Sequence, residues 1–174
     1  MNTITIERLD AAAAAAEIPG LARVLIDCVE GGASVSFMWP MTASKAEAFW
    51  SRVAAAVGRS ETILFAARDD QGICGTVQVL LSFPENQPHR GEIAKLLVHR
   101  RARNRGIAEA LMRAAEASAI EAGKTLLVLD TASDVAERLY TRLGWQLCGT
   151  IPGYALLPGG EECATVVFWK RIAP

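Results

Sequence analysis

The sequence predicts a single α/β (α+β) domain spanning residues 1–174, in which helices flank a mixed, mostly antiparallel central sheet with a parallel strand-helix-strand core. The chain is long enough for one domain to bury most of its apolar surface. Hydrophobic residues make up 51% and charged residues 21%, which is typical of a globular protein. The stretch from Glu92 to Asp130 has the order strand, helix, strand, which indicates a right-handed parallel crossover.

Apolar spacing and turn residues predict the elements in order. Apolar residues every three or four positions indicate helices, and short apolar runs between turn residues indicate strands. Ser44 and Glu47 match the S-x-x-E pattern of a capping box, which predicts the start of the second helix. The run Leu126–Leu129 is apolar at every position, which is typical of a strand buried on both faces. The expected strands are 3–9, 62–68, 74–83, 92–98, 126–129, 145–150 and 164–171, and the expected helices are 18–31, 44–58, 107–122 and 135–143.

Three segments between these elements have no clear period. The alanine run 11–16 is helix-prone but too uniform to define a buried face, so we expect an approach to the first helix. The aromatic segment 30–41 is expected to be a covering loop. Residues 152–161 are expected to form the loop between the last two strands.

Charge and composition exclude several classes of function. The formal net charge is -1, which gives no global field for binding nucleic acid or anionic lipid. No apolar run reaches the roughly 18 to 20 residues of a membrane span, and the first ten residues do not resemble an export signal. We therefore expect a cytoplasmic protein that binds neither nucleic acid nor membrane.

The cysteines and histidines do not predict a metal site. They show no C-x-x-C pair and no ligand spacing between cysteine and histidine. The cysteines are expected to be reduced and to fill the core as small apolar side chains. The residues concerned are Cys28, Cys74, Cys148 and Cys163, with His89 and His99.

A basic turn after the strand 92–98 is the most informative segment. It contains arginines and Gly106 and leads into the helix that begins near Ile107. A helix N-terminus has unpaired N–H groups and a partial positive charge, and a glycine there keeps the amides accessible, so this place favours a phosphate or pyrophosphate. Neither G-x-x-x-x-G-K-[ST] nor G-x-G-x-x-G is present, which disfavours a nucleoside triphosphate or a dinucleotide. The alternative is a solvated basic turn without a ligand.

The segment Arg103–Ala108 reads R-N-R-G-I-A and matches the [QR]-x-x-G-x-[GA] signature of the GCN5-related N-acetyltransferase (GNAT) superfamily. Leu139–Trp145 reads L-Y-T-R-L-G-W and resembles the L-Y-x-x-x-G-[FY] segment of that family. The resemblance covers about residues 90 to 150 and implies the GNAT fold, acetyl-CoA as cosubstrate, no metal, and N-acetyltransferase activity. Parts of the chain also resemble tabtoxin-resistance acetyltransferases, which implies a small amine acceptor of amino-acid-like or toxin-like structure.

The resemblance implies where the coenzyme binds. The backbone N–H groups of the signature would hold the pyrophosphate, and Leu97 and Val98 would lend strand backbone to the pantetheine arm. Many relatives have an asparagine six residues before the tyrosine, where this chain has Asp134. The implied coenzyme residues are Leu97, Val98, Arg103, Asn104, Arg105, Gly106, Ile107, Ala108 and Asp134.

Acetyl transfer to an amine needs a neutral amine, a donor for the carbonyl oxygen and a proton for the departing thiolate. Tyr140 is the family's usual proton donor. Glu92 and Asp130 are the candidate bases, because each is a carboxylate beside an apolar strand where burial favours a raised pKa. We favour Glu92 for proton removal and Asp130 for holding the acceptor or relaying a proton through water.

The remaining candidates concern specificity. Phe37, Trp39 and Tyr154 lie in expected loops and are candidates for the wall of the acceptor pocket. Lys95 interrupts an apolar strand, and we expect it to form an ion pair or to extend its charge to solvent rather than to act in catalysis.

Two alternative functions stay open. One is a non-catalytic acyl-CoA-binding module, which keeps the basic turn but lacks the proton-transfer groups. The other is a peptide or protein N-acetyltransferase, which needs an open groove for its acceptor. The family resemblance also leaves a homodimer through the terminal strands as an alternative to a monomer.

Overall fold

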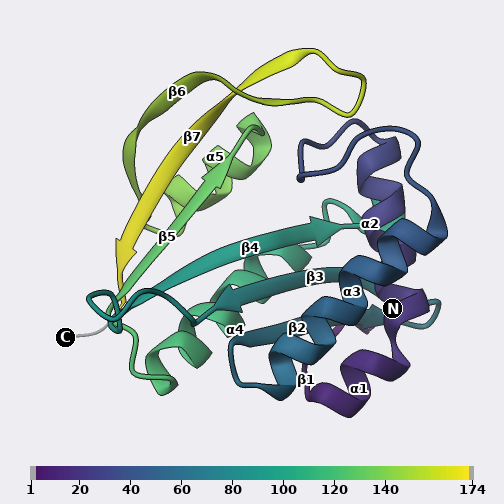
Figure 1. Ribbon diagram of the computed structural model, residues 1–174, viewed down its shortest axis with the longest axis horizontal. Coiled ribbons are helices and arrows are strands. Elements are labelled where there is room, and N and C mark those ends of the chain that lie inside the picture. Colours follow the sequence, from purple (N-terminus) through teal and green to yellow (C-terminus); the bar gives the residue numbers. More distant parts are fainter. Residues whose placement is uncertain (1–2, 173–174) are drawn as a thin grey trace.

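The computed structural model describes residues 3–172, which form a seven-stranded mixed sheet between two layers of helices (Figure 1). The strand order is β1-β2-β3-β4-β5-β7-β6, and every neighbouring pair is antiparallel except β4 with β5. The strands are β1 (Thr5–Leu9), β2 (Thr62–Asp69), β3 (Gly72–Leu80), β4 (Arg90–Val98), β5 (Leu126–Thr131), β6 (Gln146–Leu156) and β7 (Glu162–Arg171). The helices are α1 (Ala11–Ala16), α2 (Ile18–Glu30), α3 (Ala43–Gly58), α4 (Ile107–Glu121) and α5 (Asp134–Arg142), with a 3-10 turn at Arg100–Ala102.

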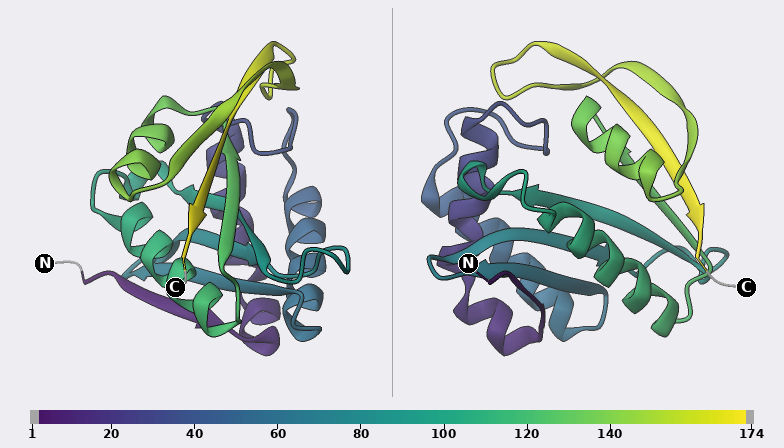
Figure 2. Two further views of the ribbon diagram at one scale, coloured as in Figure 1. Left: turned by 90° about the vertical axis from the view of Figure 1, so that its left-hand side faces the viewer. Right: turned by 180° about the vertical axis from the view of Figure 1, so that it is seen from behind.

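Two cores hold the layers together, one on each face of the sheet. Helices α1, α2 and α3 cover one face, where Trp50 and Leu25 are fully buried against alternate residues of β2. Helices α4 and α5 cover the other face, where Leu111 of α4 packs against the opposite set of strand residues. Figure 2 shows the two layers from the side and from behind. The parallel β4-α4-β5 crossover expected from the sequence is confirmed.

The parallel strands β4 and β5 pair over only three residues and then separate. Their ladder joins Arg90, Gly91 and Glu92 to Leu126, Leu127 and Val128, although β4 continues to Val98 and β5 to Thr131. Figure 1 shows the two strands diverging from this point. We call this place the β4–β5 fork. Beyond it, the edge of β4 that faces β5 has no strand partner.

A β-bulge lies in β4 just past the fork. Gln78 of β3 pairs with Ala94 and Thr76 pairs with Leu97, so β4 holds one extra residue between these pairs. Lys95 has a φ of 51°, in the left-handed region, and Thr76 Oγ1 donates to its carbonyl oxygen at 3.0 Å. A bulge bends a strand and redirects its side chains. It therefore sets where the Lys95 side chain points.

Several sequence expectations were wrong in detail. The alanine run forms its own helix α1, because the side chain of Asp10 accepts a hydrogen bond from Ala13 N and caps it. Thr42, not Ser44, caps α3 by accepting from Lys45 N. Strand β6 extends to Leu156, so the loop expected at 152–161 is reduced to 157–161.

The expectation that β5 is buried on both faces was also wrong. Leu127 and Leu129 are buried against the α4 face, whereas Leu126 and Val128 are half-buried. The reason is the fork, which leaves the other face of β5 without a continuous covering layer. Among the cysteines, Cys28 and Cys74 are buried as expected, but Cys148 is exposed because it lies on the edge strand β6.

Candidate functional site

The N-terminus of α4 lies directly after the basic turn and has no side-chain cap. Asp10, Thr42 and Ser133 cap the helices that they precede, but the N-cap of α4 is Gly106, with a φ of 74°. Nothing in residues 3–172 lies within 4 Å of the position of a Cβ on Gly106. The first N–H groups of α4 are therefore free of side-chain partners and sterically accessible, which suits a phosphate.

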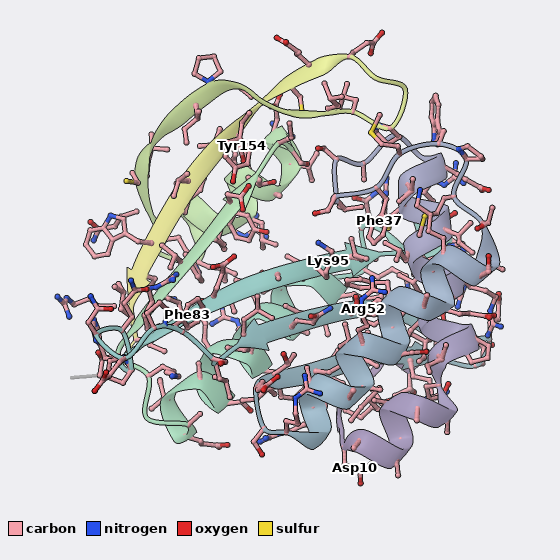
Figure 3. All side chains as sticks on the ribbon, viewed as in Figure 1. Asp10, Phe37, Arg52, Phe83, Lys95 and Tyr154 are labelled. Carbon is pink, nitrogen blue, oxygen red and sulfur yellow. The ribbon has the colours of Figure 1, made fainter. Side chains whose placement is uncertain are left out.

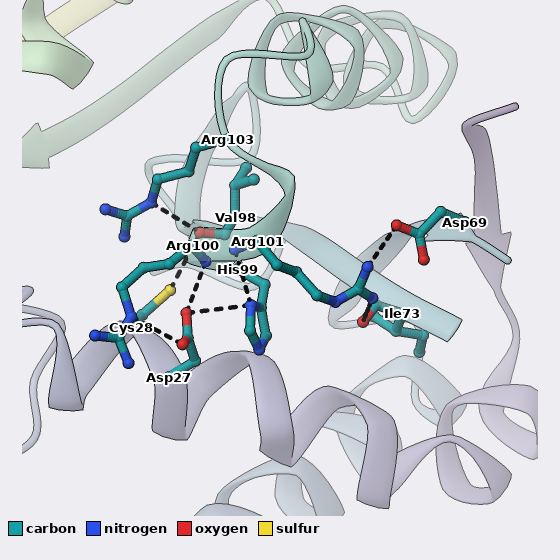
Figure 4. Close-up of polar contacts among 9 residues, drawn as sticks. All are labelled: Asp27, Cys28, Asp69, Ile73, Val98, His99, Arg100, Arg101 and Arg103. Atoms are coloured by element: carbon teal, nitrogen blue, oxygen red, sulfur yellow. Dashed lines mark hydrogen bonds and ion pairs between the residues drawn. The ribbon is translucent and has the colours of Figure 1, made fainter. Parts of the chain in front are cut away.

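Two acidic side chains hold the basic turn in place (Figure 4). Asp27 of α2 accepts from Arg100 N at 2.8 Å and from Arg100 Nε at 2.9 Å. Asp69, at the end of β2, pairs with both Arg101 and Arg105, and only 1% of its side chain is exposed. These two arginines therefore neutralise a buried carboxylate and fix the turn, rather than only offering charge to a ligand.

We predict that Asp69→Asn loosens this turn. The Arg101 hydrogen bond and charge hold the pKa of Asp69 below its usual 3.8. Replacement should lower the free energy of unfolding at pH 7 by about 1–3 kcal/mol, the range for hydrogen bonds to charged groups. The pKa of Asp69 is lower in the folded protein than in the unfolded chain. The extra stability of the wild type over Asp69→Asn is therefore complete at neutral pH and is lost as pH falls through the folded-state pKa of Asp69. Urea unfolding of both proteins between pH 7 and pH 3 checks this, and a difference that does not shrink in acid would contradict it.

The open edge of β4 offers backbone groups next to that helix N-terminus. His99 N donates to Cys74 O on β3, so by the alternation of a strand the Val98 N–H points to the opposite edge, toward the fork. The Val98 carbonyl accepts from Arg103 Nε at 3.3 Å and from Cys28 Sγ at 3.6 Å. By the same alternation Leu97 turns its backbone toward β3, and its side chain is buried.

Tyr140 lies on α5 with its ring in the core. The ring centroid is 6.0 Å from that of Trp145 and 5.8 Å from that of Phe168. Burial, followed by the nearby charge of Asp130, raises the pKa of the Tyr140 hydroxyl above its usual value. No hydrogen bond joins the hydroxyl to another residue of the described chain. The raised pKa keeps the hydroxyl protonated at neutral pH.

Glu92 and Asp130 lie closer together than their places at opposite ends of two strands suggested. Glu92 is in register with Val128, and Asp130 is two residues beyond it on the same face. Asp130 Oδ2 accepts from Thr165 Oγ1 at 2.6 Å, and Glu92 lies 3.5 Å from Arg90 Nη1. Both carboxylates act electrostatically on Lys95. The fork thus brings both candidate bases to one face.

Lys95 is the residue that sequence reasoning missed. It forms no ion pair within residues 3–172, and its Nζ donates instead to Ser36 Oγ at 3.2 Å. Figure 3 shows Lys95 on β4 and Phe37 in the nearby loop, with Tyr154 on the side of β6 and β7. The sequence shows a lysine in an otherwise apolar strand, which could have indicated a functional residue. It does not show that this lysine lies at a β-bulge.

The loop 31–42 and the β6–β7 turn meet across the wide end of the fork. Trp39 N donates to Pro158 O at 3.0 Å, and Ser34 Oγ donates to Leu156 O at 3.3 Å. The Trp39 indole N–H also binds Val29 O, and its ring packs close to Gly159. Trp39 therefore holds this bridge together, whereas Phe37 packs inward with its ring centroid 5.3 Å from that of Phe49.

The other candidates have simpler surroundings. Asp134 is exposed at the N-terminus of α5, beside the Ser133 cap. Tyr154 is 57% exposed on β6.

No group of three or more His, Cys, Asp or Glu side chains in residues 3–172 is placed to hold a metal ion. Within the same residues, no helix has the length and apolar character needed to span a membrane.

Comparison with known proteins shows one family match and several solved structures of the same fold. A model of the acetyltransferase (GNAT) family matches residues 21–145. An N-acetyltransferase from Staphylococcus aureus Mu50 has the same fold, with a TM-score of 0.81 and 14% identity over 98% of this chain and 99% of that chain.

Two further solved structures share the fold, and their names state two different acceptors. One is a phosphinothricin acetyltransferase from Sinorhizobium meliloti in complex with acetyl-CoA, with a TM-score of 0.80 and 16% identity over 98% of this chain and 89% of that one. The other is a ribosomal-protein-alanine N-acetyltransferase from Brucella melitensis, with a TM-score of 0.77 and 20% identity over 96% and 99%. At these sequence identities the similarity shows the fold alone. The acceptor of this chain must therefore be inferred from the residues of its site.

Proposed function

Because the chain belongs to the acetyltransferase (GNAT) family, we propose that it transfers the acetyl group of acetyl-CoA to the amine of a small molecule by direct attack. The observation that carries this proposal is the β4–β5 fork. There the unpaired edge of β4 runs from Glu92, which shares a face with Asp130, to Val98, which precedes the turn into the uncapped N-terminus of α4. The charge of Asp130 also acts on the protonated Tyr140 hydroxyl. These groups are the ones that acetyl transfer requires.

The residues fit the coenzyme in two places. The N–H groups of Gly106, Ile107 and Ala108 would bind the pyrophosphate, since the accessible helix N-terminus favours negative charge. The Val98 N–H at the open edge of β4 would bind an amide carbonyl of the pantetheine arm, as a neighbouring strand would. This placement brings the thioester to the fork.

The chemistry balances with the residues present. Glu92 takes a proton from the acceptor ammonium, and the freed amine nitrogen forms a bond to the thioester carbonyl carbon. The C–S bond breaks, and its electron pair leaves with sulfur, which receives the proton of the Tyr140 hydroxyl. The newly bonded nitrogen gives up its second proton, which restores the Tyr140 hydroxyl through solvent, and Glu92 releases the first proton to solvent. The products are an N-acetylated amine and the free thiol, and no covalent intermediate on the protein is needed.

The bridge between the loop 31–42 and the β6–β7 turn supports a small acceptor. Its hydrogen bonds link the two sides of the fork at its wide end. An extended peptide needs an open groove across the site, whereas a small molecule fits beneath a closed bridge. Release of thiol from acetyl-CoA across a panel of small amines, amino acids, aminoglycosides and peptides tests the proposal. Turnover of peptides alone would contradict it, as would acetyl-CoA binding without any turnover.

We predict that Gly106→Ala weakens coenzyme binding selectively. Gly106 has a φ of 74°, and its Cβ position is open toward the proposed pyrophosphate site. Gly123, at the other end of α4, has a φ of 76° and is equally open, so Gly123→Ala is a matched control for backbone strain. Both variants should lose about 1–2 kcal/mol of stability. Only Gly106→Ala should raise the acetyl-CoA Kd, by about tenfold, measured by calorimetry. Equal Kd values for the two variants would contradict this assignment.

A further inference from the structure

Lys95 is a cation near two carboxylates that do not pair with it. Its side chain is half-buried at the bulge of β4, and the charges of Asp130 and Glu92 both act on it. No salt bridge to Lys95 forms in the part of the chain that the structure describes. A partly desolvated ammonium without an ionic partner is suited to bind an anionic group from outside the protein.

The position of this ammonium is fixed by two unusual backbone segments. Lys95 and its partner Ser36 are both non-glycine residues with a positive φ, of 51° and 75°. Thr76 Oγ1 holds the Lys95 carbonyl, and Ser36 Oγ accepts from Lys95 Nζ. Such backbone conformations are retained when the surrounding structure enforces them. A long flexible side chain is thus held in one place next to the fork.

Burial lowers the pKa of the Lys95 amine below its usual value, and the charges of Asp130 and Glu92 oppose that shift by attracting the charged form. The ammonium also lies 5.7 Å from the centroid of the Phe49 ring, an arrangement that attracts a cation. A neutral amine acting as a base would gain nothing from these partners. Apart from Arg90, which pairs with Glu92, the site therefore holds one positive and two negative groups on the same side of the fork.

This arrangement of charges complements a molecule that carries both an acid and an amine. We propose that Lys95 binds an anionic group of the acceptor, a carboxylate or an isosteric oxyanion, while the acceptor's amine faces Glu92 and Asp130. The inference rests on the proposed function, and it narrows the acceptor class to amino-acid-like zwitterions. Lys95 is then the residue that selects acidic acceptors over neutral amines.

Gln78, on the strand beside Lys95, provides independent evidence for a buried polar group that lacks a partner. The residue is 3% exposed, and its backbone pairs with that of Ala94, the residue before Lys95. Its Nε2 has no hydrogen-bond partner in residues 3–172. A buried amide donor normally has a partner, from protein, water or ligand. An oxyanion held by Lys95 is an acceptor of the kind that this donor lacks.

The test compares matched acceptors that differ only in the acid. Each L-amino acid of a panel is assayed beside its carboxamide and its decarboxylated amine, with wild type, Lys95→Met and Lys95→Arg. Wild type should prefer the acid over the amide in kcat/KM. Lys95→Met should lower kcat/KM for the acid by about 10- to 100-fold, the value of a charge-assisted hydrogen bond, and leave the amide nearly unchanged. Lys95→Arg should keep part of the preference. Arg52→Met, which removes an exposed cation of α3, is the control.

Three outcomes would overturn the inference, and they are separable from failure of the proposed function. A wild type that accepts neutral amines but no acidic ones keeps acetyl transfer and removes the role of Lys95. An equal loss on acid and amide in Lys95→Met indicates a structural or proton-transfer role. If no amine is acetylated, calorimetry of the same amino acids with the CoA-loaded protein decides: Lys95-dependent binding supports the inference, and no binding overturns it.

Discussion

Tyr140→Phe should lower kcat by about 10²- to 10⁴-fold while the Kd for acetyl-CoA changes little, because the variant removes only the proton that the departing thiolate receives. Burial and the charge of Asp130 keep the wild-type hydroxyl protonated across the neutral range. Stopped-flow or steady-state thiol release, with calorimetry for the coenzyme, measures the two quantities separately.

Tyr140→Phe should leave the fold and its stability nearly unchanged. The Tyr140 hydroxyl has no partner within the described residues, and the ring contacts with Trp145 and Phe168 remain in phenylalanine. The free energy of unfolding should therefore stay within about 0.5 kcal/mol of wild type. A variant that keeps full turnover would remove Tyr140 from the mechanism. One that loses coenzyme binding in parallel would indicate a positioning role for α5.

Glu92→Gln and Asp130→Asn should fail in different ways. If Glu92 removes the proton, Glu92→Gln should lower kcat by about 10²- to 10³-fold near pH 7. That loss should shrink as pH rises, because more of the acceptor amine is then neutral without help. If Asp130 holds the acceptor, Asp130→Asn should raise KM more than it lowers kcat. Thiol release from pH 6 to pH 10 with one accepted amine measures both.

The contacts of the two carboxylates allow Glu92→Gln and Asp130→Asn to be compared directly. Asp130 Oδ2 already accepts from Thr165 Oγ1, and Glu92 lies near Arg90, so an amide at either position retains shape and one hydrogen-bonding oxygen. The reverse pattern, with the pH-dependent loss in Asp130→Asn, would exchange the two roles. Small effects in both variants would mean that water removes the proton without either carboxylate.

Local signals predicted most of the fold correctly because they depend on neighbouring residues. The apolar period of 107–122 and Gly123 after it predict α4, and the turn at 69–72 predicts the β2–β3 hairpin. These features arise from side-chain periodicity and turn chemistry, which a sequence shows directly. The errors occurred where tertiary contacts decide, as in β6, which continues to Leu156 because β7 pairs with it.

The sequence by itself determined the class of the protein. The signature at Arg103–Ala108 and the segment around Tyr140 predicted the family, since a glycine at a helix N-terminus and a tyrosine in a short helix are local requirements. Only the tertiary structure decided how the charges meet. The separation of β4 and β5 exposes one strand edge, the bulge directs Lys95, and the register brings Glu92 and Asp130 to one face. These relations join residues distant along the chain, and strand register and bulges are set by packing rather than by neighbouring residues.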